Sequence, residues 1–153
     1  MIALVLLGVL FYILLSDRNN NLSDKIINYI DYNADESNIC TLDMNEITDF
    51  KWDKMLFFGV GSNNTEISNA LGVEYKDSTD LVSGIVFVYN NKIVYKESIP
   101  YNPDHPSKLL LYVGNMFGEP SYRVFTPNDA IFKGSRREKK GEFYYKIEPH
   151  KTN

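Results

Sequence analysis

The chain has 153 residues, of which 44% are hydrophobic and 14% aromatic, and its formal net charge is −4. This apolar content is sufficient for a packed core and excludes an intrinsically disordered chain. Because acidic residues outnumber Lys and Arg by 20 to 16, a broad nucleic-acid-binding surface is also excluded, and we predict no nucleic-acid partner.

Residues 1–16 are predicted to form a transmembrane anchor or a signal-like segment. The stretch from Ile2 to Leu15 carries no charge. A spanning helix needs about 20 apolar residues, and a signal peptide needs a basic start and a small-residue cleavage site, which this stretch lacks. Three interpretations remain open: an uncleaved anchor with residues missing upstream, a short tilted anchor, or a buried core helix. The last is disfavoured because the stretch is apolar on every face, so we predict membrane attachment.

Residues 17–21 are predicted to be a polar stalk, and residues 22–153 a single α+β globular domain. Arg18 would place this domain in the cytoplasm by the positive-inside tendency, whereas short N-terminal anchors followed by one domain usually export it. We predict a single-pass protein of the cell membrane with an extracytoplasmic domain. Cys40, the only cysteine, excludes an internal disulfide and lies too far behind the apolar stretch to be a lipidation site.

The stretch LSDKIINYIDYN is predicted to form the first helix. Apolar residues recur there at helical spacing, and Ser23 is available as the N-cap; the apolar residues are Leu22, Ile26, Ile27 and Ile30.

The stretch DYNADESN begins with the spacing of a calcium-binding loop, with oxygen-bearing side chains at Asp31, Asn33 and Asp35. The match ends at Glu36, where the sharp turn requires Gly, and at Leu42, where the loop requires a bidentate Glu. We therefore predict a helix end followed by a turn, and no metal site.

The stretch TDFKWDKMLFFGVG contains the only tryptophan. Charged and apolar residues alternate as far as Asp53, and from Met55 the run MLFFGV is apolar at every position. Alternation followed by a continuous apolar run predicts a strand that passes from the edge of a sheet into its centre. Trp52 is predicted to lie at the rim of the core, with its indole N–H bonded to a backbone carbonyl or water. The alternative is an aromatic contact with a ligand.

The stretch GVGSN leads from this strand into a second predicted helix. It resembles a phosphate-binding turn but lacks a third glycine and a Gly-Lys-Ser/Thr ending, so no nucleotide cofactor is predicted. Ser62 or Asn64 can instead cap a helix that Gly72 ends.

The rest of the chain is predicted to form short strands. SGIVFVYNNKIVYKESIP indicates a hairpin, because Asn90 and Asn91 tolerate the positive φ of a two-residue turn. Pro100, Pro103 and Pro106 then force an irregular loop. Further strands are predicted in NICTLDM, SKLLLYVG (alternatively a helix), SYRVF, DAIFKG and EFYYKIE, with turns at 127–129 and 134–141. The predicted fold is α+β, with a mainly antiparallel sheet and two short helices, preceded by an N-terminal hydrophobic membrane helix.

The stretch KGSRREKKGE concentrates positive charge in an acidic chain. The pattern favours a solvated hairpin tip between two glycines. The functional alternative is contact with an anionic surface or partner, namely lipid headgroups, wall polymer or an acidic protein. The candidate contact residues are Lys133, Arg136, Arg137, Lys139 and Lys140.

His105 and His150 are the only histidines. Neither has a second ligand at metal spacing, or a Ser or Cys in a nucleophile motif such as Gly-x-Ser-x-Gly. We predict no catalytic, cofactor-binding or metal-binding residues, and no enzymatic activity.

The stretches ITDFKWDKMLFFGVG, EISNALGVEYKD and GIVFVYNNKIVY carry a resemblance. From about Thr41 to Tyr95 the chain is similar to a group of small uncharacterised proteins of Gram-positive bacteria, which have an N-terminal membrane anchor or a lipoprotein leader. The resemblance implies an exported, anchored and non-enzymatic domain. The group has no assigned activity, so no functional residues follow from it. The basic n-region of such leaders is missing before Ile2.

These observations favour a membrane-anchored extracytoplasmic protein with a binding, immunity-type or envelope accessory function, whose partner is a protein or an envelope component. The first alternative is an envelope enzyme that acts on wall polymer through His105 and scattered carboxylates. The second is a cytoplasm-facing domain that binds lipid or a partner through the basic hairpin tip.

Overall fold

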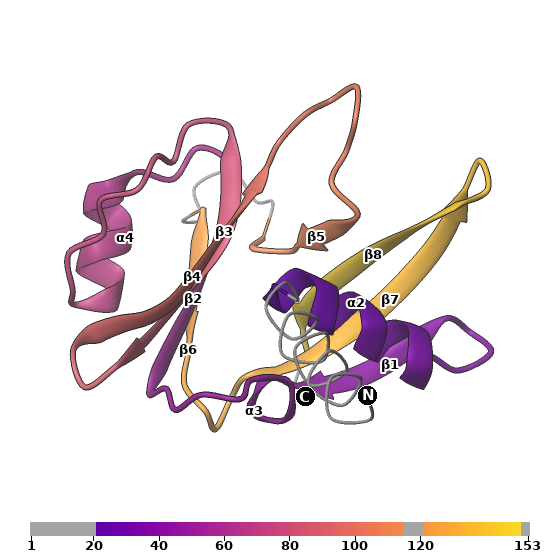
Figure 1. Cartoon of the computed structure of the whole chain (residues 1–153), viewed down its shortest axis with the longest axis horizontal. Helices are drawn as coiled ribbons and strands as arrows, with labels where there is room; N and C mark the ends of the chain where they lie inside the picture. Colours follow the sequence, from indigo (N-terminus) through magenta and orange to yellow (C-terminus); the bar gives the residue numbers. More distant parts are fainter. Residues whose placement is uncertain (1–20, 115–120, 151–153) are drawn as a thin grey trace, which may run out of the picture.

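Two four-stranded sheets and three helices make up residues 21–114 and 121–150, which are the residues that the computed structural model describes (Figure 1). Every strand pair is antiparallel except β5–β8. An α+β fold with mostly antiparallel pairing is therefore confirmed. The predicted single sheet with two helices needs correction, because the strands divide between two sheets and one further short helix is present.

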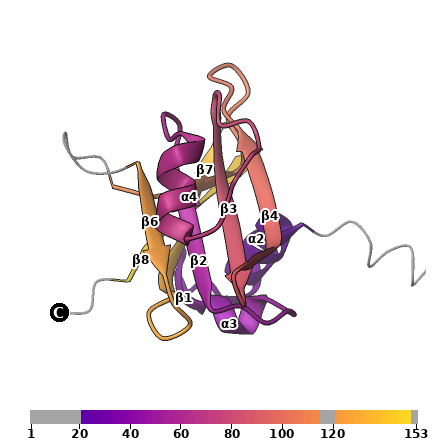
Figure 2. The ribbon, with the colours of Figure 1, turned by 90° about the vertical axis from the view of Figure 1, so that its left-hand side faces the viewer.

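The first sheet has the order β4-β3-β2-β6. Its strands are β2 (Lys54–Phe58), β3 (Val82–Tyr89), β4 (Lys92–Pro100) and β6 (Tyr122–Phe125). The apolar run in β2 is explained by burial on both faces. Met55 and Phe57 face the core shared with the second sheet, and Leu56 and Phe58 face the opposite side. There α4 (Asn64–Leu71) covers the sheet, as Figure 2 shows.

Helix α4 confirms the second predicted helix but begins from a different cap. Asn63, rather than Ser62 or Asn64, accepts a hydrogen bond from the Glu66 N–H, and the Glu66 side chain accepts one from the Asn63 N–H. This reciprocal pair is a capping box. Gly72 ends the helix as predicted, with φ of 76°, a left-handed conformation in which glycine carries no Cβ penalty.

The second sheet has the order β1-β7-β8-β5. Its strands are β1 (Ile39–Asp43), β5 (Leu109–Leu111), β7 (Ile131–Lys139) and β8 (Glu142–Pro149). Its inner face contributes Leu42, Phe132 and Ile147 to the shared core. The stretch SKLLLYVG does form a strand, β5, which is short and runs parallel to β8.

Helix α2 (Leu22–Asn33) has the predicted bounds and joins the two sheets. Its Ile26 and Ile30 are fully buried in the shared core. The predicted cap is wrong: Asn21 accepts from the Asp24 N–H at 2.8 Å. The buried Ser23 hydroxyl has no hydrogen-bond partner among the described residues.

The calcium-like spacing after α2 forms a turn. Asp35 Oδ1 accepts hydrogen bonds from the N–H groups of Ser37 and Ile39, as expected for an aspartate that stabilises its own turn. Among the described residues, no three His, Cys, Asp or Glu side chains are grouped closely enough to hold a metal ion.

The one-turn helix α3 (Met44–Ile47) was not predicted. Asp43 caps it by accepting from the Asn45 N–H at 2.8 Å. A single turn has too few residues to show helical periodicity, and its first residue, Met44, continued the alternation of the preceding strand.

Trp52 is 7% exposed and lies in the shared core, where its ring packs edge-on against Phe87 at 5.2 Å. Its indole N–H donates to Thr48 Oγ1 at 3.0 Å, so the acceptor is a side-chain hydroxyl rather than the predicted carbonyl or water. This placement leaves little of the ring open to a ligand.

The predicted anchor and most of the stalk fall in residues 1–20, outside the described residues. Of the helices in residues 21–114 and 121–150, none combines the length and the apolar character needed to cross a membrane.

Candidate functional site

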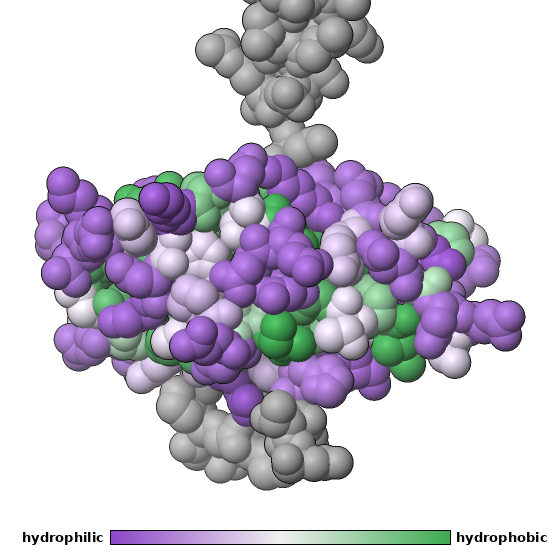
Figure 3. Space-filling model, turned by 90° about the horizontal axis from the view of Figure 1, so that it is seen from below, coloured by the Kyte–Doolittle hydropathy of each residue, from purple (hydrophilic) through white to green (hydrophobic). Residues whose placement is uncertain are grey.

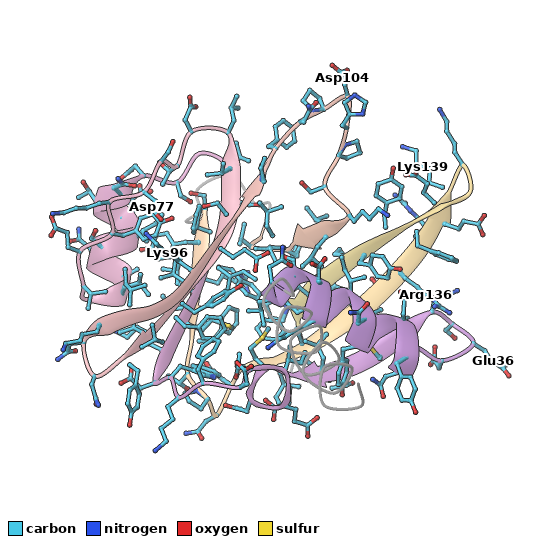
Figure 4. All side chains as sticks on the ribbon, in the orientation of Figure 1. Glu36, Asp77, Lys96, Asp104, Arg136 and Lys139 are labelled. Carbon is cyan, nitrogen blue, oxygen red and sulfur yellow. The ribbon has the colours of Figure 1, made fainter. Side chains whose placement is uncertain are left out.

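A groove of about 600 Å³ lies between the loop that joins β4 to β5 and the β7–β8 hairpin. The apex of this loop carries Asp104, and the hairpin carries Lys139 towards its far end (Figure 4). One wall is built from residues 99–101 and 106–110, and the other from residues on both strands of the hairpin. The groove is therefore formed by segments that are distant in the sequence.

The charge of the groove is opposite to that of the whole chain. Its lining contains five basic residues and no Asp or Glu. The five are Lys108, Arg136, Arg137, Lys139 and Lys146. A concave site lined by one sign of charge attracts ligands of the opposite sign, so the groove favours anions although the chain carries a net charge of −4.

Two of these cations have carboxylate partners. Arg136 Nη1 lies 3.1 Å from Asp31 Oδ1 of α2, and Lys146 Nζ lies 2.8 Å from Glu148 Oε2. The hydrogen bond from Lys146 lowers the pKa of Glu148, and the nearby charge of Lys133 adds to the effect. Their charge is thus largely compensated within the protein.

The other three cations are available to a ligand. Lys108, Arg137 and Lys139 are exposed, and within residues 21–114 and 121–150 none of them has a carboxylate partner. An Arg guanidinium and Lys ammonium groups on adjacent walls can bind carboxylate or phosphate oxygens by charge-assisted hydrogen bonds.

The groove also has apolar walls. Tyr101 and Leu110 are 55% and 58% exposed, and they line it together with Ile99, Pro106 and Tyr144. The groove therefore combines unpaired positive charge with apolar surface. By contrast, the face of the molecule that is seen from below in the orientation of Figure 1 is mainly hydrophilic, with only small, separate apolar areas (Figure 3).

Local bonding fixes the loop wall. Ser107 Oγ donates to the Pro100 carbonyl at 2.6 Å, and Asn102 Oδ1 accepts from the N–H groups of Asp104 and His105. The prolines restrict the backbone further. At the base, the Tyr145 N–H donates to the Lys108 carbonyl at 2.7 Å, so the position of Lys108 is set by β8.

The hairpin wall is bonded to α2. Both carboxylate oxygens of Asp31 accept from the Tyr145 hydroxyl, at 2.9 and 2.8 Å. Burial raises the pKa of Tyr145 to about 12, and the bond to Asp31 adds to the rise. Arg136 Nε also donates to Asn38 Oδ1 at 2.9 Å. Arg136 and Tyr145 therefore position the hairpin.

The predicted basic residues separate into groups. The structure corrects the predicted turn over 134–141, because β7 continues to Lys139 and the turn is only Lys140 and Gly141, with φ of 55° and 80°. Arg136, Arg137 and Lys139 therefore lie on a strand and line the groove, and Lys140 lies in the turn outside it. Lys133 lies nearer the start of β7, 3.6 Å from Glu148.

Lys108, Lys146 and the tyrosines of the groove were missed by the sequence analysis. Tyr144 and Lys146 share a face of the sheet with Arg137 and Ser135, their cross-strand partners, and the alternation in EFYYKIE could have indicated this once the turn was placed at Lys140 and Gly141. Nothing local pointed to Lys108, since its position depends on the parallel pairing of β5 with β8.

The two histidines lie in different parts of the fold. His105 follows Asp104 at the apex of the β4–β5 loop, and the His150 N–H donates to the carbonyl of Ile131 at the start of β7. The structure does not bring them together, and neither lines the groove.

No known protein family matches this chain, and no curated protein or solved structure shows detectable similarity to it.

Proposed function

We propose that this protein is a membrane-anchored, extracytoplasmic binding domain without catalytic activity, and that its basic groove holds an anionic partner. The apolar N-terminal stretch supports the anchor, and the export of the domain follows from the usual behaviour of such anchors. One observation carries the binding function: Lys108, Arg137 and Lys139 converge, without carboxylate partners in the described residues, on a groove that contains no acidic side chain.

The binding function is tested with the full-length chain in detergent micelles and two polyanion probes, poly-glutamate and inorganic polyphosphate. We expect R137E/K139E to weaken binding by about tenfold or more, because two attractive contacts of up to roughly 1 kcal/mol each become repulsive. Affinity should also fall as salt is added, since salt screens exposed charges.

The matched control is K51E/K92E, which reverses two exposed lysines outside the groove. Lys92 begins β4, at the end opposite to Ile99 and the groove. We expect this variant to change affinity less than threefold at moderate salt. Equal losses in both variants, or no binding of either probe, would contradict the proposed function.

The compartment is tested by adding protease to intact cells that express the full chain with a C-terminal epitope. Loss of the epitope places the domain outside. Protection of the epitope until the cells are permeabilised places it in the cytoplasm, as the Arg18 signal would indicate.

A further inference from the structure

The edge of β8 is open next to the groove. In an antiparallel hairpin, hydrogen-bonded and non-hydrogen-bonded residue pairs alternate. The two-residue turn at Lys140 and Gly141 makes Lys139↔Glu142 a hydrogen-bonded pair, so Glu138↔Phe143 is a non-hydrogen-bonded pair. The N–H and C=O of Phe143 therefore point away from β7.

The bonds further along β8 agree with this alternation. Tyr145 N–H donates to the Lys108 carbonyl at 2.7 Å, and the carbonyl of Ile147 accepts from the Tyr112 N–H at 2.9 Å. Both groups point to the side of β8 that β5 occupies. Phe143 has the same parity, so its N–H and C=O point to this side too.

Strand β5 does not reach Phe143. It pairs with β8 only from Tyr145 to Ile147, and the chain before it diverges at Pro106 and Ser107, where Ser107 Oγ bonds to Pro100. Within residues 21–114 and 121–150, the backbone of Phe143 has no hydrogen-bond partner. The open edge lies next to the groove, because Tyr144, which follows Phe143, and Tyr145, where the pairing with β5 begins, both line it.

We propose that the partner in the groove is an extended peptide segment of another protein, with alternating acidic and apolar side chains, that pairs with β8 at Phe143. This inference rests on the proposed function of the groove. The backbone of the segment takes up the free N–H and C=O, as in strand addition to a sheet edge. Its acidic side chains meet Lys108, Arg137 and Lys139 on one face of the sheet, and its apolar side chains, on the opposite face, meet the Phe143 ring, which is 43% exposed.

The groove and the open edge beside it favour a peptide over the other anionic ligands. A phosphate polymer would use the cations and leave the exposed Phe143 ring, with its free N–H and C=O, without complementary contacts. A bilayer surface is flat and would contact the exposed turn at Lys140 rather than a concave site. Only a peptide matches the charge, the exposed Phe143 ring and the unpaired backbone groups together.

The test uses the full-length chain in detergent micelles and an eight-residue peptide of alternating Glu and Val. Two further versions carry N-methyl groups, one on every Val and the other on every Glu, and each blocks one edge of the extended peptide. The competing probes are inorganic polyphosphate and phosphatidylglycerol vesicles. For the vesicle measurement, the chain is held in zwitterionic nanodiscs. We expect the unmodified peptide to bind, and only one methylated version to lose affinity, by tenfold or more.

Two variants of Phe143 test the protein side. F143P removes the free N–H but leaves the hydrogen bonds to β7 intact. F143A is its matched control, because it also loses the ring but keeps the N–H. We expect F143P to bind the peptide at least tenfold more weakly than F143A, with equal affinities of the two variants for polyphosphate. Thermal melts monitor folding. If F143P does not fold, the methylated peptides decide the question.

The outcomes separate the two proposals. If polyphosphate or vesicles bind in a manner sensitive to R137E/K139E and the peptide does not, the peptide inference is overturned and the proposed function stands. If the peptide binds and both methylated versions bind equally well, pairing at β8 is overturned. If R137E/K139E and K51E/K92E behave alike with every probe, both proposals fail.

Discussion

Gly134 shows how one missing side chain sets the distance between α2 and the second sheet. A Cβ at this position would lie 2.8 Å from Ile30 Cγ1 and 2.8 Å from Leu42 Cδ2. The sequence pattern predicts the start of a turn at this glycine, but it lies inside β7. Its function is close approach between elements, which depends on neighbours from other parts of the chain.

Substituting Gly134 tests this packing. We expect G134A to lower the free energy of unfolding by about 1–3 kcal/mol, because extra volume in a filled core forces neighbours from their positions. The measurement is urea denaturation followed by circular dichroism. The control T41A lies on the exposed face of β1 and should change stability by less than about 0.5 kcal/mol. A G134A variant as stable as T41A would contradict the packing account.

Tyr95 and Tyr145 each have a pKa raised to about 12 by burial and by a hydrogen bond to a carboxylate, Glu97 and Asp31 respectively. Unfolding returns these hydroxyls towards the ordinary pKa of 10. Below pH 10 both states are protonated and the contribution to stability is complete. Above it the unfolded state ionises first, so this contribution is lost as pH rises towards 12.

We therefore expect the free energy of unfolding to fall between pH 10 and about pH 12, with a shallower slope in the Y95F/Y145F variant. Urea denaturation at several pH values measures both slopes, and the difference between them removes the contribution of lysines that titrate in the same range. Identical slopes would show that these hydroxyls ionise as easily in the folded chain as in the unfolded one.

At the scale of elements, the β7–β8 hairpin is fixed to α2 through Arg136 and is free at Arg137. Arg136 contacts Asp31 and Asn38 and lies 5.3 Å above the Phe143 ring, whereas Arg137 is exposed on the other face. Adjacent positions of one strand thus have different functions, because successive side chains point to opposite faces.

The two arginines are expected to differ on charge reversal. R136E places a second negative charge beside the Asp31 carboxylate and should lower the free energy of unfolding by about 1–2 kcal/mol, a value reduced for partial exposure. R137E should change it by less than about 0.5 kcal/mol. Thermal unfolding of both variants checks this, and equal effects would show that the contact with α2 is weak.

Local patterns were sufficient for most elements and insufficient for the groove. The bounds of α2, the turn at Asn90 and Asn91 and the apolar run of β2 followed from periodicity and turn chemistry. The alternating residues before Lys54 were predicted to begin this strand but lie outside it. The division into two sheets and the parallel pairing of β5 depend on contacts between distant segments, which periodicity does not encode. Lys108 therefore entered the candidate site only from the structure.

At the scale of the whole molecule, the start of α2 is bonded to the first sheet. Glu97 Oε2 on β4 accepts from the N–H of Leu22 at 2.9 Å and of Ser23 at 3.2 Å. A carboxylate at a helix N-terminus satisfies free N–H groups and complements the helix dipole. Because α2 also packs on the second sheet, Glu97 helps to hold the two sheets together.

Removing the charge of Glu97 tests this link. We expect E97Q to lower the free energy of unfolding by about 1 kcal/mol through loss of the charge–dipole interaction and weaker hydrogen bonds. E36Q is the control, since Glu36 lies exposed in the turn after α2 (Figure 4). Differential scanning calorimetry of both variants should show a lower transition temperature for E97Q alone.

The burial of Trp52 has a practical consequence for spectroscopy. Because it is the only tryptophan, the tryptophan fluorescence of the chain reports on a single position, beside Phe87 in the shared core. It precedes the end of β2 that pairs with Val88, whereas the groove lies at the Ser83 end of the neighbouring strand. Its emission should shift to longer wavelength on unfolding and stay constant when the groove is filled, so one optical signal separates loss of the fold from binding.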